Sequence, residues 1–355
     1  MFTTPPRPAE VTVLFPEIAD LARTAVRLHP RRGTPHAQQS SVAGPMVWPA
    51  DEEWPTCRLP HLVEVRRPMT DEEQELRRRA GERLAAAAAR SGASSLAARF
   101  EARRKEAAGA DSAEPPTVRT WEPAVPPEPV PLLPVLQLFA ADAPPIAFPS
   151  GTDLLQLLWC PFQHQEAPGQ KPHYNGPAVH LLWRAAAGLA TAGTAPAPAP
   201  GSESGYLLQP CVLHPEQVTE YPDVEDLPEP LRSDVLEWEE DEADPSGGEE
   251  PRGYDYRNDL STATGLKAGG WPYWPHGPRP LGCPDCGGAS SLLLTVPNGE
   301  RGADSWTPAE EQHVTVGRAD GQAFHDPTGF SGARDALMVF VCAEDPHHQA
   351  YVDIE

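Results

Sequence analysis

The segment "GCPDCGG" contains two cysteines, Cys283 and Cys286, that are separated by two residues. At this spacing one tight turn can aim both sulfurs at a single metal ion. A closed zinc site needs four ligands, which are mostly thiolates and imidazoles. Further along the chain, Cys342 ends an apolar run and is followed by His347 and His348. We therefore predict a structural zinc site formed by the three cysteines and one of the two histidines, with no position left for water.

Two other interpretations of this segment remain open. Cys283 and Cys286 could be free loop thiols, with Cys342 buried in a strand and the histidines exposed. They could also form a redox pair, whose reactive thiol needs the N-terminus of a helix beside it. Glycines and an apolar, strand-like run follow Cys286, and this pattern favours the metal site over the redox pair.

The segment that leads to Cys283 has a counterpart near the start of the chain. Residues 43–57 read "AGPMVWPADEEWPTC" and residues 269–283 read "GGWPYWPHGPRPLGC". In both, a glycine precedes a Trp-Pro pair by four positions, and a cysteine follows that tryptophan nine positions later. Large aromatic side chains are usually buried, so we expect both tryptophans to anchor a core rather than to line a cleft. The residues of this motif are Trp48 and Cys57 in the first copy, and Gly270, Trp274 and Cys283 in the second.

The similarity continues downstream of both segments. A leucine-rich run follows in each copy, at residues 135–139 and 292–296. A second apolar run then ends in cysteine, "DLLQLLWC" at Cys160 and "DALMVFVC" at Cys342, and histidine follows soon after, as His164 in the first copy. Short apolar runs between turn residues are typical of buried strands. An ordered series of this kind predicts an internal duplication with two similar lobes.

The first copy departs from the second at the ligand positions. Pro60 stands where the counterpart of Cys286 would be. Because one ligand of the Cys-x-x-Cys pair is missing, we favour a metal-free core in the first lobe over a second site. The residues left for such a site are Cys57, Cys160 and either His164 or His214.

The segments between these runs predict the remaining organisation. Apolar spacing indicates a helix over residues 17–27. Thr70 and Glu73 form a capping box that begins a helical insertion at residues 70–110. Residues 221–258 contain a strongly acidic stretch and are expected to be a linker between a first lobe, 1–220, and a second lobe, 259–355. The fold class that follows is α+β, with two pseudo-repeated lobes of mainly antiparallel strands and a helical insertion.

Composition limits the classes of function. The chain has 355 residues, of which 45 are proline, and a formal net charge of −23. Such a charge opposes binding to nucleic acids and to anionic membranes, but it allows a basic protein partner. The first residues lack the apolar region of a signal peptide and no apolar run is long enough to span a bilayer, so we expect a cytoplasmic protein. Its six cysteines are then expected to be free thiols or metal ligands.

Motifs of the common enzyme classes are absent from the sequence. There is no phosphate-binding Walker loop, no Gly-x-Ser-x-Gly segment and no His-Glu-x-x-His segment. No catalytic residue is therefore predicted. An enzyme or a small-ligand-binding protein with a cleft between the lobes remains the alternative to a non-catalytic protein, because catalytic groups can assemble from distant residues.

Several of the quoted segments resemble known families. "SSVAGPMVWP", "WPTC", "VLQLF", "LKAGGWPYW", "CPDCGG", "SLLLTV" and "ALMVFVC" are similar to the YwqG-like family of bacterial proteins. The second half also resembles the programmed-cell-death-two protein family. The resemblance covers residues 40–60 and 130–355, and it implies an α+β body of antiparallel strands without an established active site. It further implies a non-catalytic protein-binding module, either an immunity protein beside a secreted toxin or a dedicated chaperone for a basic ribosomal protein.

Overall fold

The computed structural model divides the chain into two compact units. The larger unit contains residues 1–61 and 125–355, and the smaller unit contains residues 62–124. The structure describes residues 2–90, 116–165, 167–169, 175–191, 195–243, 253–277, 279, 281–300, 302–312 and 325–354. Within this part of the chain, no helix combines the length and the apolar composition needed to cross a membrane.

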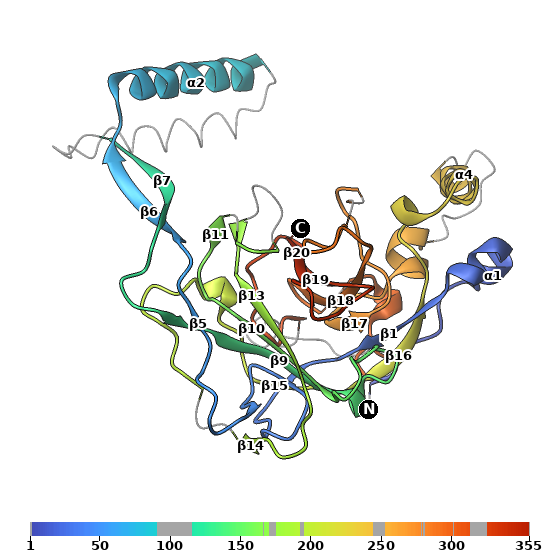
Figure 1. The fold of residues 1–355 in the computed structure, drawn as a ribbon. Helices are drawn as coiled ribbons and strands as arrows, with labels where there is room; N and C mark the ends of the chain where they lie inside the picture. Colours follow the sequence, from blue (N-terminus) through green and yellow to red (C-terminus); the bar gives the residue numbers. More distant parts are fainter. Residues whose placement is uncertain are drawn as a thin grey trace. The chain divides into compact units, whose positions relative to one another are not determined.

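Two six-stranded antiparallel sheets form the larger unit (Figure 1). The first-lobe sheet has the order β13-β10-β9-β3-β15-β2, and the second-lobe sheet has the order β16-β1-β17-β18-β19-β20. The strands of the first-lobe sheet are β13 (Val179–Arg184), β10 (Leu154–Trp159), β9 (Leu133–Phe139), β3 (Ser41–Val42), β15 (Cys211–Val212) and β2 (Arg31–Arg32). Those of the second-lobe sheet are β16 (Glu216–Glu220), β1 (Arg23–Arg27), β17 (Lys267–Gly269), β18 (Ser290–Pro297), β19 (Ala336–Cys342) and β20 (Tyr351–Ile354).

The two sheets repeat one pattern, which confirms the predicted pair of similar lobes. The order β3-β9-β10-β13 corresponds to β17-β18-β19-β20. The register shifts between β9 and β10 at Leu157/Leu158, and it shifts between the corresponding strands β18 and β19 at Leu292/Leu294. The residue that follows β3, Ala43, and the last residue of β17, Gly269, both have positive φ angles, 48° and 69°. Bulges and left-handed residues thus lie at matching places in the two sheets.

The first part of the chain contributes two strands, β1 and β16, to the second-lobe sheet. β1 comes from the start of the chain, yet it pairs with β16 and β17 in the second-lobe sheet. The prediction of one helix over residues 17–27 is therefore wrong: a 3-10 helix, η1, covers Pro16–Leu21 and β1 follows it. Hydrogen bonding to strands on both sides outweighs the helical spacing of the apolar residues, because Ala25 and Val26 become completely buried in the sheet.

One hydrophobic core joins the two sheets. It includes Val135 and Leu157 from the first-lobe sheet and Leu294 and Val339 from the second-lobe sheet. Strands β10 and β19, which each have a strand on both sides, consist almost entirely of apolar residues, and almost every residue in them is buried. These nearly continuous apolar runs are the reason that the sequence predicts both strands correctly.

A second hydrophobic cluster joins apolar residues of the segment expected to be an acidic linker to residues near the start of the chain. Residues 221–258 contain the 3-10 helix η4 (Val224–Asp226) and the helix α4 (Leu231–Ala243). Leu231 and Val235, one helical turn apart, are buried together with Tyr221. The described residues of the segment pack because buried apolar residues such as Leu231 and Val235 lie on one side of α4, whereas several acidic residues of the helix are exposed. Residues 244–252 lie outside the described part of the chain.

The remaining elements of the larger unit are short. Three pairs of two-residue strands lie beside the sheets: β4 (Val47–Trp48) with β14 (Ala190–Thr191), β5 (Thr56–Cys57) with β8 (Val130–Pro131), and β11 (His164–Gln165) with β12 (Asn175–Gly176). The short helices are α1 (Val11–Leu14), η2 (Ala140–Asp142), η3 (Ser204–Tyr206), η6 (Asp304–Trp306) and the π-helix η5 (Tyr256–Ser261).

The smaller unit is the predicted helical insertion. Strand β6 (His61–Pro68), which starts at the last residue of the larger unit, pairs with β7 (Thr117–Ala124), and the helix α2 (Asp71–Arg90) lies between them in the sequence. The predicted capping box is present, since the Thr70 N–H donates to Glu73 Oε2 over 2.9 Å and the Glu73 N–H donates to Thr70 Oγ1 over 3.3 Å. Gly81 does not interrupt α2. Residues 91–110 of the predicted insertion lie outside the described residues.

Candidate metal centres

The predicted second-lobe ligands lie together. The ligand atoms of Cys283, Cys286, Cys342 and His348 are all within 4.8 Å of one another. Cys283 Sγ is 3.5 Å from His348 Nδ1, and the sulfurs of Cys286 and Cys342 are 3.6 Å apart. The choice between the two histidines falls on His348, because His347 is not a member of this group.

A tight turn aims Cys283 and Cys286 at the same point. The Cys283 N–H donates to the carbonyl of Gly288 over 2.7 Å, and the Gly287 N–H donates to the carbonyl of Cys283 over 2.9 Å. Gly287 has a φ of 71°, which only glycine adopts without strain. The Gly288 N–H also donates to Cys286 Sγ over 3.4 Å. The glycines after the second cysteine therefore serve the turn, and β18 rather than a helix follows it.

The third sulfur comes from the end of β19. A hydrogen bond from the backbone N–H of Asp345, helped by others from His348 and Glu344, lowers the pKa of Cys342 to about 6. Its thiolate, which is the form that binds metal, is thus favoured at neutral pH. Hydrogen bonding to Cys342 also raises the pKa of His348. Cys286 is exposed, whereas Cys283 and Cys342 are buried.

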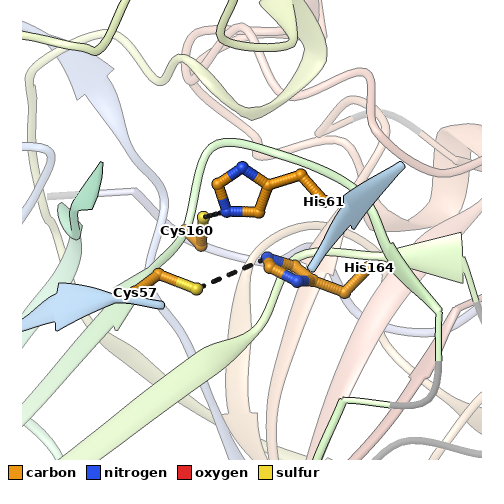
Figure 2. A group of neighbouring side chains, drawn as sticks. All are labelled: Cys57, His61, Cys160 and His164. Atoms are coloured by element: carbon orange, nitrogen blue, oxygen red, sulfur yellow. Dashed lines mark hydrogen bonds between the residues drawn. The ribbon is translucent and has the colours of Figure 1, made fainter. Parts of the chain in front are cut away.

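A second group of ligands converges in the first lobe (Figure 2). It consists of Cys57, His61, Cys160 and His164, whose ligand atoms also lie within 4.8 Å of one another. Cys57 Sγ is 3.8 Å from His164 Nε2, and Cys160 Sγ is 3.4 Å from His61 Nε2. All four residues are buried, with exposed fractions between 0% and 6%.

Short strands position the first-lobe ligands. Cys57 ends β5, His61 begins β6, and His164 begins β11. Cys160 directly follows β10, and its N–H donates to the carbonyl of Ala178 over 2.9 Å. Each ligand is therefore fixed through its backbone at the end of a strand.

Hydrogen bonding and stacking orient the two imidazoles. Nδ1 of His164 is 2.9 Å from the carbonyl oxygen of Pro60, so an Nδ1–H donates to it and Nε2 is left facing the cluster. The ring of His61 is stacked on Phe162, with the ring centres 4.4 Å apart and the planes 4° from parallel. Such contacts are the usual means by which proteins orient histidine ligands.

His61 is the ligand that sequence reasoning missed. Position 60, which corresponds to Cys286 of the second copy, is proline, but the fourth ligand is the next residue, His61. The premise that the first copy lacks a ligand is therefore wrong. A signal was present, because Cys57 and His61 have the same Cys-x-x-x-His spacing as Cys160 and His164. His214, considered instead, lies outside the cluster and packs against the ring of Phe2.

The two buried sulfurs of the first lobe share their protons unequally. A hydrogen bond from the thiol of Cys160 lowers the pKa of Cys57, against the effect of burial. The same hydrogen bond, together with burial, raises the pKa of Cys160. Only one of the two thiols is therefore ready to ionise while no cation stands between them.

The motif residues near the cysteines are structural, as predicted. Trp48 and Trp274 are 6% and 1% exposed, which confirms them as core anchors. The indole N–H of Trp274 donates to Asp226 Oδ2 over 2.7 Å, and that of Trp48 donates to the carbonyl of Glu52 over 3.1 Å. Gly270 has a φ of 75° and lies directly after β17.

A cavity of about 260 Å³ opens on the second-lobe sheet. Lys267 of β17 and Thr295 of β18, which are direct neighbours in the register, line it together with Thr264 and Arg257. The hydroxyls of Thr264 and Thr295 and Nε of Arg257 are buried and have no hydrogen-bond partner among the described residues. This is a feature of small-ligand sites, in which a few polar groups converge on a concave surface.

Comparisons with known proteins add no name to these sites. No protein-family model matches the chain, and no curated protein is significantly similar to it in sequence. The interpretation of the two clusters accordingly depends on their geometry and on the chemistry of their ligands.

Proposed function

We propose that this protein is a non-catalytic protein-binding module whose second lobe is fastened by a structural zinc ion. The ligands are Cys283, Cys286, Cys342 and His348. The observation that supports this proposal is the spacing of their ligand atoms, which is 3.5 Å between Cys283 and His348 and 3.6 Å between Cys286 and Cys342. A zinc tetrahedron with thiolate and imidazole ligands places its ligand atoms about 3.3–3.8 Å apart.

The ligand set favours a structural role over a catalytic one. Three thiolates and one imidazole fill a tetrahedral shell, so no position remains for a water or a substrate. When bound, zinc supplies folding energy by joining the turn after Cys283 to the end of β19. The protein's own part is to hold the turn closed through the backbone hydrogen bonds around Gly287 and Gly288.

Metal analysis of protein purified without chelator tests the zinc proposal. Cys283→Ser should remove one equivalent of zinc per chain relative to the wild type. Cys211→Ser is the matched control, because Cys211 is also buried but belongs to neither cluster. A second-lobe site is contradicted if the folded Cys283→Ser protein keeps the full zinc content of the wild type.

Charge supports a basic protein as the partner. The chain carries a net charge of −23, and α4 exposes the acidic side chains of Asp234, Glu237 and Glu240. Immunity proteins and dedicated chaperones, the roles that the family resemblance implies, both bind another protein. An acidic surface recognises a basic partner by complementary charge, which also speeds association.

Retention of proteins from a cell lysate at two salt concentrations tests this partner. Partners should be retained at low salt and lost at high salt, because screening weakens attraction between opposite charges. The triple variant Asp234→Asn, Glu237→Gln, Glu240→Gln should retain less, while the exposed control pair Asp51→Asn, Glu53→Gln should not differ from the wild type. The absence of any retained protein at low salt would count against the proposal.

Small-ligand binding is the second candidate function, and the cavity on the second-lobe sheet supports it. Nε of Arg257 and the hydroxyls of Thr264 and Thr295 line this cavity without a hydrogen-bond partner among the described residues, so a small anion that accepts hydrogen bonds is the expected ligand class. Inorganic phosphate and acetate should raise the melting temperature of the wild type more than that of Thr295→Val. Equal shifts in the two proteins would argue against a site in this cavity.

A further inference from the structure

The first lobe contains a second complete set of zinc ligands. We infer that Cys57, His61, Cys160 and His164 bind a zinc ion of their own, in a closed site. This inference does not depend on the second-lobe zinc, because the two sets share no residue.

The distances in this cluster fit one tetrahedral ion. Cys57 Sγ and His164 Nε2 are separated by 3.8 Å, and Cys160 Sγ and His61 Nε2 are separated by 3.4 Å. These values match the roughly 3.3–3.8 Å between the ligand atoms of a zinc tetrahedron. In Figure 2 the four side chains come from opposite sides and point toward a common centre. Because all four ligand atoms lie within 4.8 Å of one another, one ion can be placed among them.

In each cluster, the exposure of the ligands to water matches the net charge that a zinc complex would have. Two thiolates and two neutral imidazoles cancel the charge of Zn²⁺, so the first-lobe complex would be neutral. All four of its ligands are buried, and a neutral complex is the kind that tolerates burial. Three thiolates in the second lobe leave one negative charge, and there Cys286 is exposed to water. Each cluster thus has the exposure that its complex would require.

The structure already orients one first-lobe imidazole for metal binding. The carbonyl of Pro60 keeps the proton of His164 on Nδ1 and presents Nε2 to the centre. Pro60 occupies the position at which a Cys-x-x-Cys pair would place its second cysteine, so the residue that looked like a lost ligand instead orients another ligand. Such partners of histidine ligands are characteristic of real metal sites.

The surroundings of the cluster give a bound ion a structural task. Among the described residues, β5 pairs only with β8 and β11 only with β12, and each of these strands has two residues. Isolated pairs of such short strands are marginal in water. A zinc ion would join Cys57 at the end of β5 to His164 at the start of β11. It would also fix His61, the last residue of the larger unit before the insertion.

Zinc content of a set of variants tests the inference. We expect two zinc ions per chain in the wild type, one in His61→Ala, one in Cys283→Ser and none in the double variant. His214→Ala is the matched control, since it removes a histidine outside the cluster, and it should keep both ions. The conservative variant His61→Cys should also keep both zinc ions, because cysteine supplies a ligand at the same position. If His61→Ala does not fold, the zinc content of His61→Cys still tests the inference.

Replacement of zinc by Co²⁺ identifies which site each variant retains. Absorption from thiolate-to-cobalt charge transfer grows with the number of thiolates, so Cys283→Ser should show a site with two and His61→Ala a site with three. A folded Cys283→Ser protein without zinc would overturn the inference and leave the second-lobe proposal intact. A wild type with one zinc that survives Cys283→Ser but not His61→Ala would support the inference and overturn the second-lobe proposal.

Discussion

At the scale of single residues, a buried ion pair explains the glycine of the Gly-x-x-x-Trp-Pro motif. Glu220 and Lys267 are almost fully buried, and Lys267 Nζ lies 2.7 Å and 2.9 Å from the two carboxylate oxygens. The same carboxylate accepts hydrogen bonds from the backbone N–H groups of Ala263 and Trp271. A Cβ on Gly270 would stand 2.2 Å from Glu220 Oε2. The second copy of the motif requires glycine because this carboxylate occupies the space.

Gly270→Ala should therefore destabilise the protein by more than about 3 kcal/mol, through a clash added to the strain of a positive φ. Gly277→Ala is the matched control, because Gly277 also has a positive φ, 89°, but no atom lies within 4 Å of an added Cβ. The control should lose only about 1–2 kcal/mol. Urea denaturation measures the free energy of unfolding of both variants, and an equal loss of stability in the two would contradict the explanation.

Lys267→Met should cost about 3–5 kcal/mol, since it leaves the buried carboxylate of Glu220 without its counter-ion. The double variant Lys267→Met, Glu220→Gln should recover part of this loss, because no unpaired charge remains. Denaturation midpoints of the two variants provide the test. A double variant less stable than Lys267→Met would show that the hydrogen bonds of Glu220, rather than its charge, dominate.

At the scale of elements, the insertion is separate from the core of the larger unit. None of the hydrophobic clusters among the described residues includes a residue from 62–124. The helix α2 is stabilised locally instead, by its capping box and by ion pairs such as Arg78 with Glu75 and Glu82. The Met69 N–H donates to the carbonyl of Pro116 over 2.8 Å and brings the two ends of the insertion together.

Replacement of residues 70–115 by Asn-Gly should leave the larger unit folded. The new turn would connect β6 to β7 as a hairpin, for which this dipeptide is well suited. We expect a change of a few degrees at most in the melting temperature and an unchanged zinc content. Loss of zinc or of cooperative unfolding would show that the larger unit depends on the insertion.

At the scale of the whole molecule, the contribution of β1 and β16 to the second-lobe sheet makes the two lobes one folding unit. β1 and β16 belong to the second-lobe sheet although residues 259–355 do not contain them. Glu220, the buried partner of Lys267, also lies outside residues 259–355. The shared core adds contacts between the two sheets.

A fragment of residues 259–355 should therefore not unfold cooperatively by itself, even though it contains all four second-lobe zinc ligands. Coexpression with residues 1–258 should restore a stable complex, because it returns β1, β16 and Glu220. Denaturation followed by circular dichroism, with and without the second fragment, checks this expectation. A cooperative transition in the isolated fragment would contradict it.

The sequence predicts those features of the fold that depend on residues close together in the chain. The runs ending in Cys160 and Cys342 must be buried strands, since they are apolar on both faces. Cys283 and Cys286 were found because a short loop fixes their separation in space. The capping box at Thr70 is local for the same reason.

Tertiary structure alone decided the features that depend on distant partners. Residues 23–27 became a strand because β16 and β17 flank them, although their apolar spacing suits a helix. The acidic segment at 221–258 packs because a hydrophobic cluster receives its few apolar side chains. His61 joined the first-lobe ligands, and His348 rather than His347 joined those of the second lobe, because a ligand is chosen by where its ring points in the folded chain. The repeat and most of the ligands are thus written in the sequence, whereas the completion of each cluster depends on contacts between residues that are far apart in it.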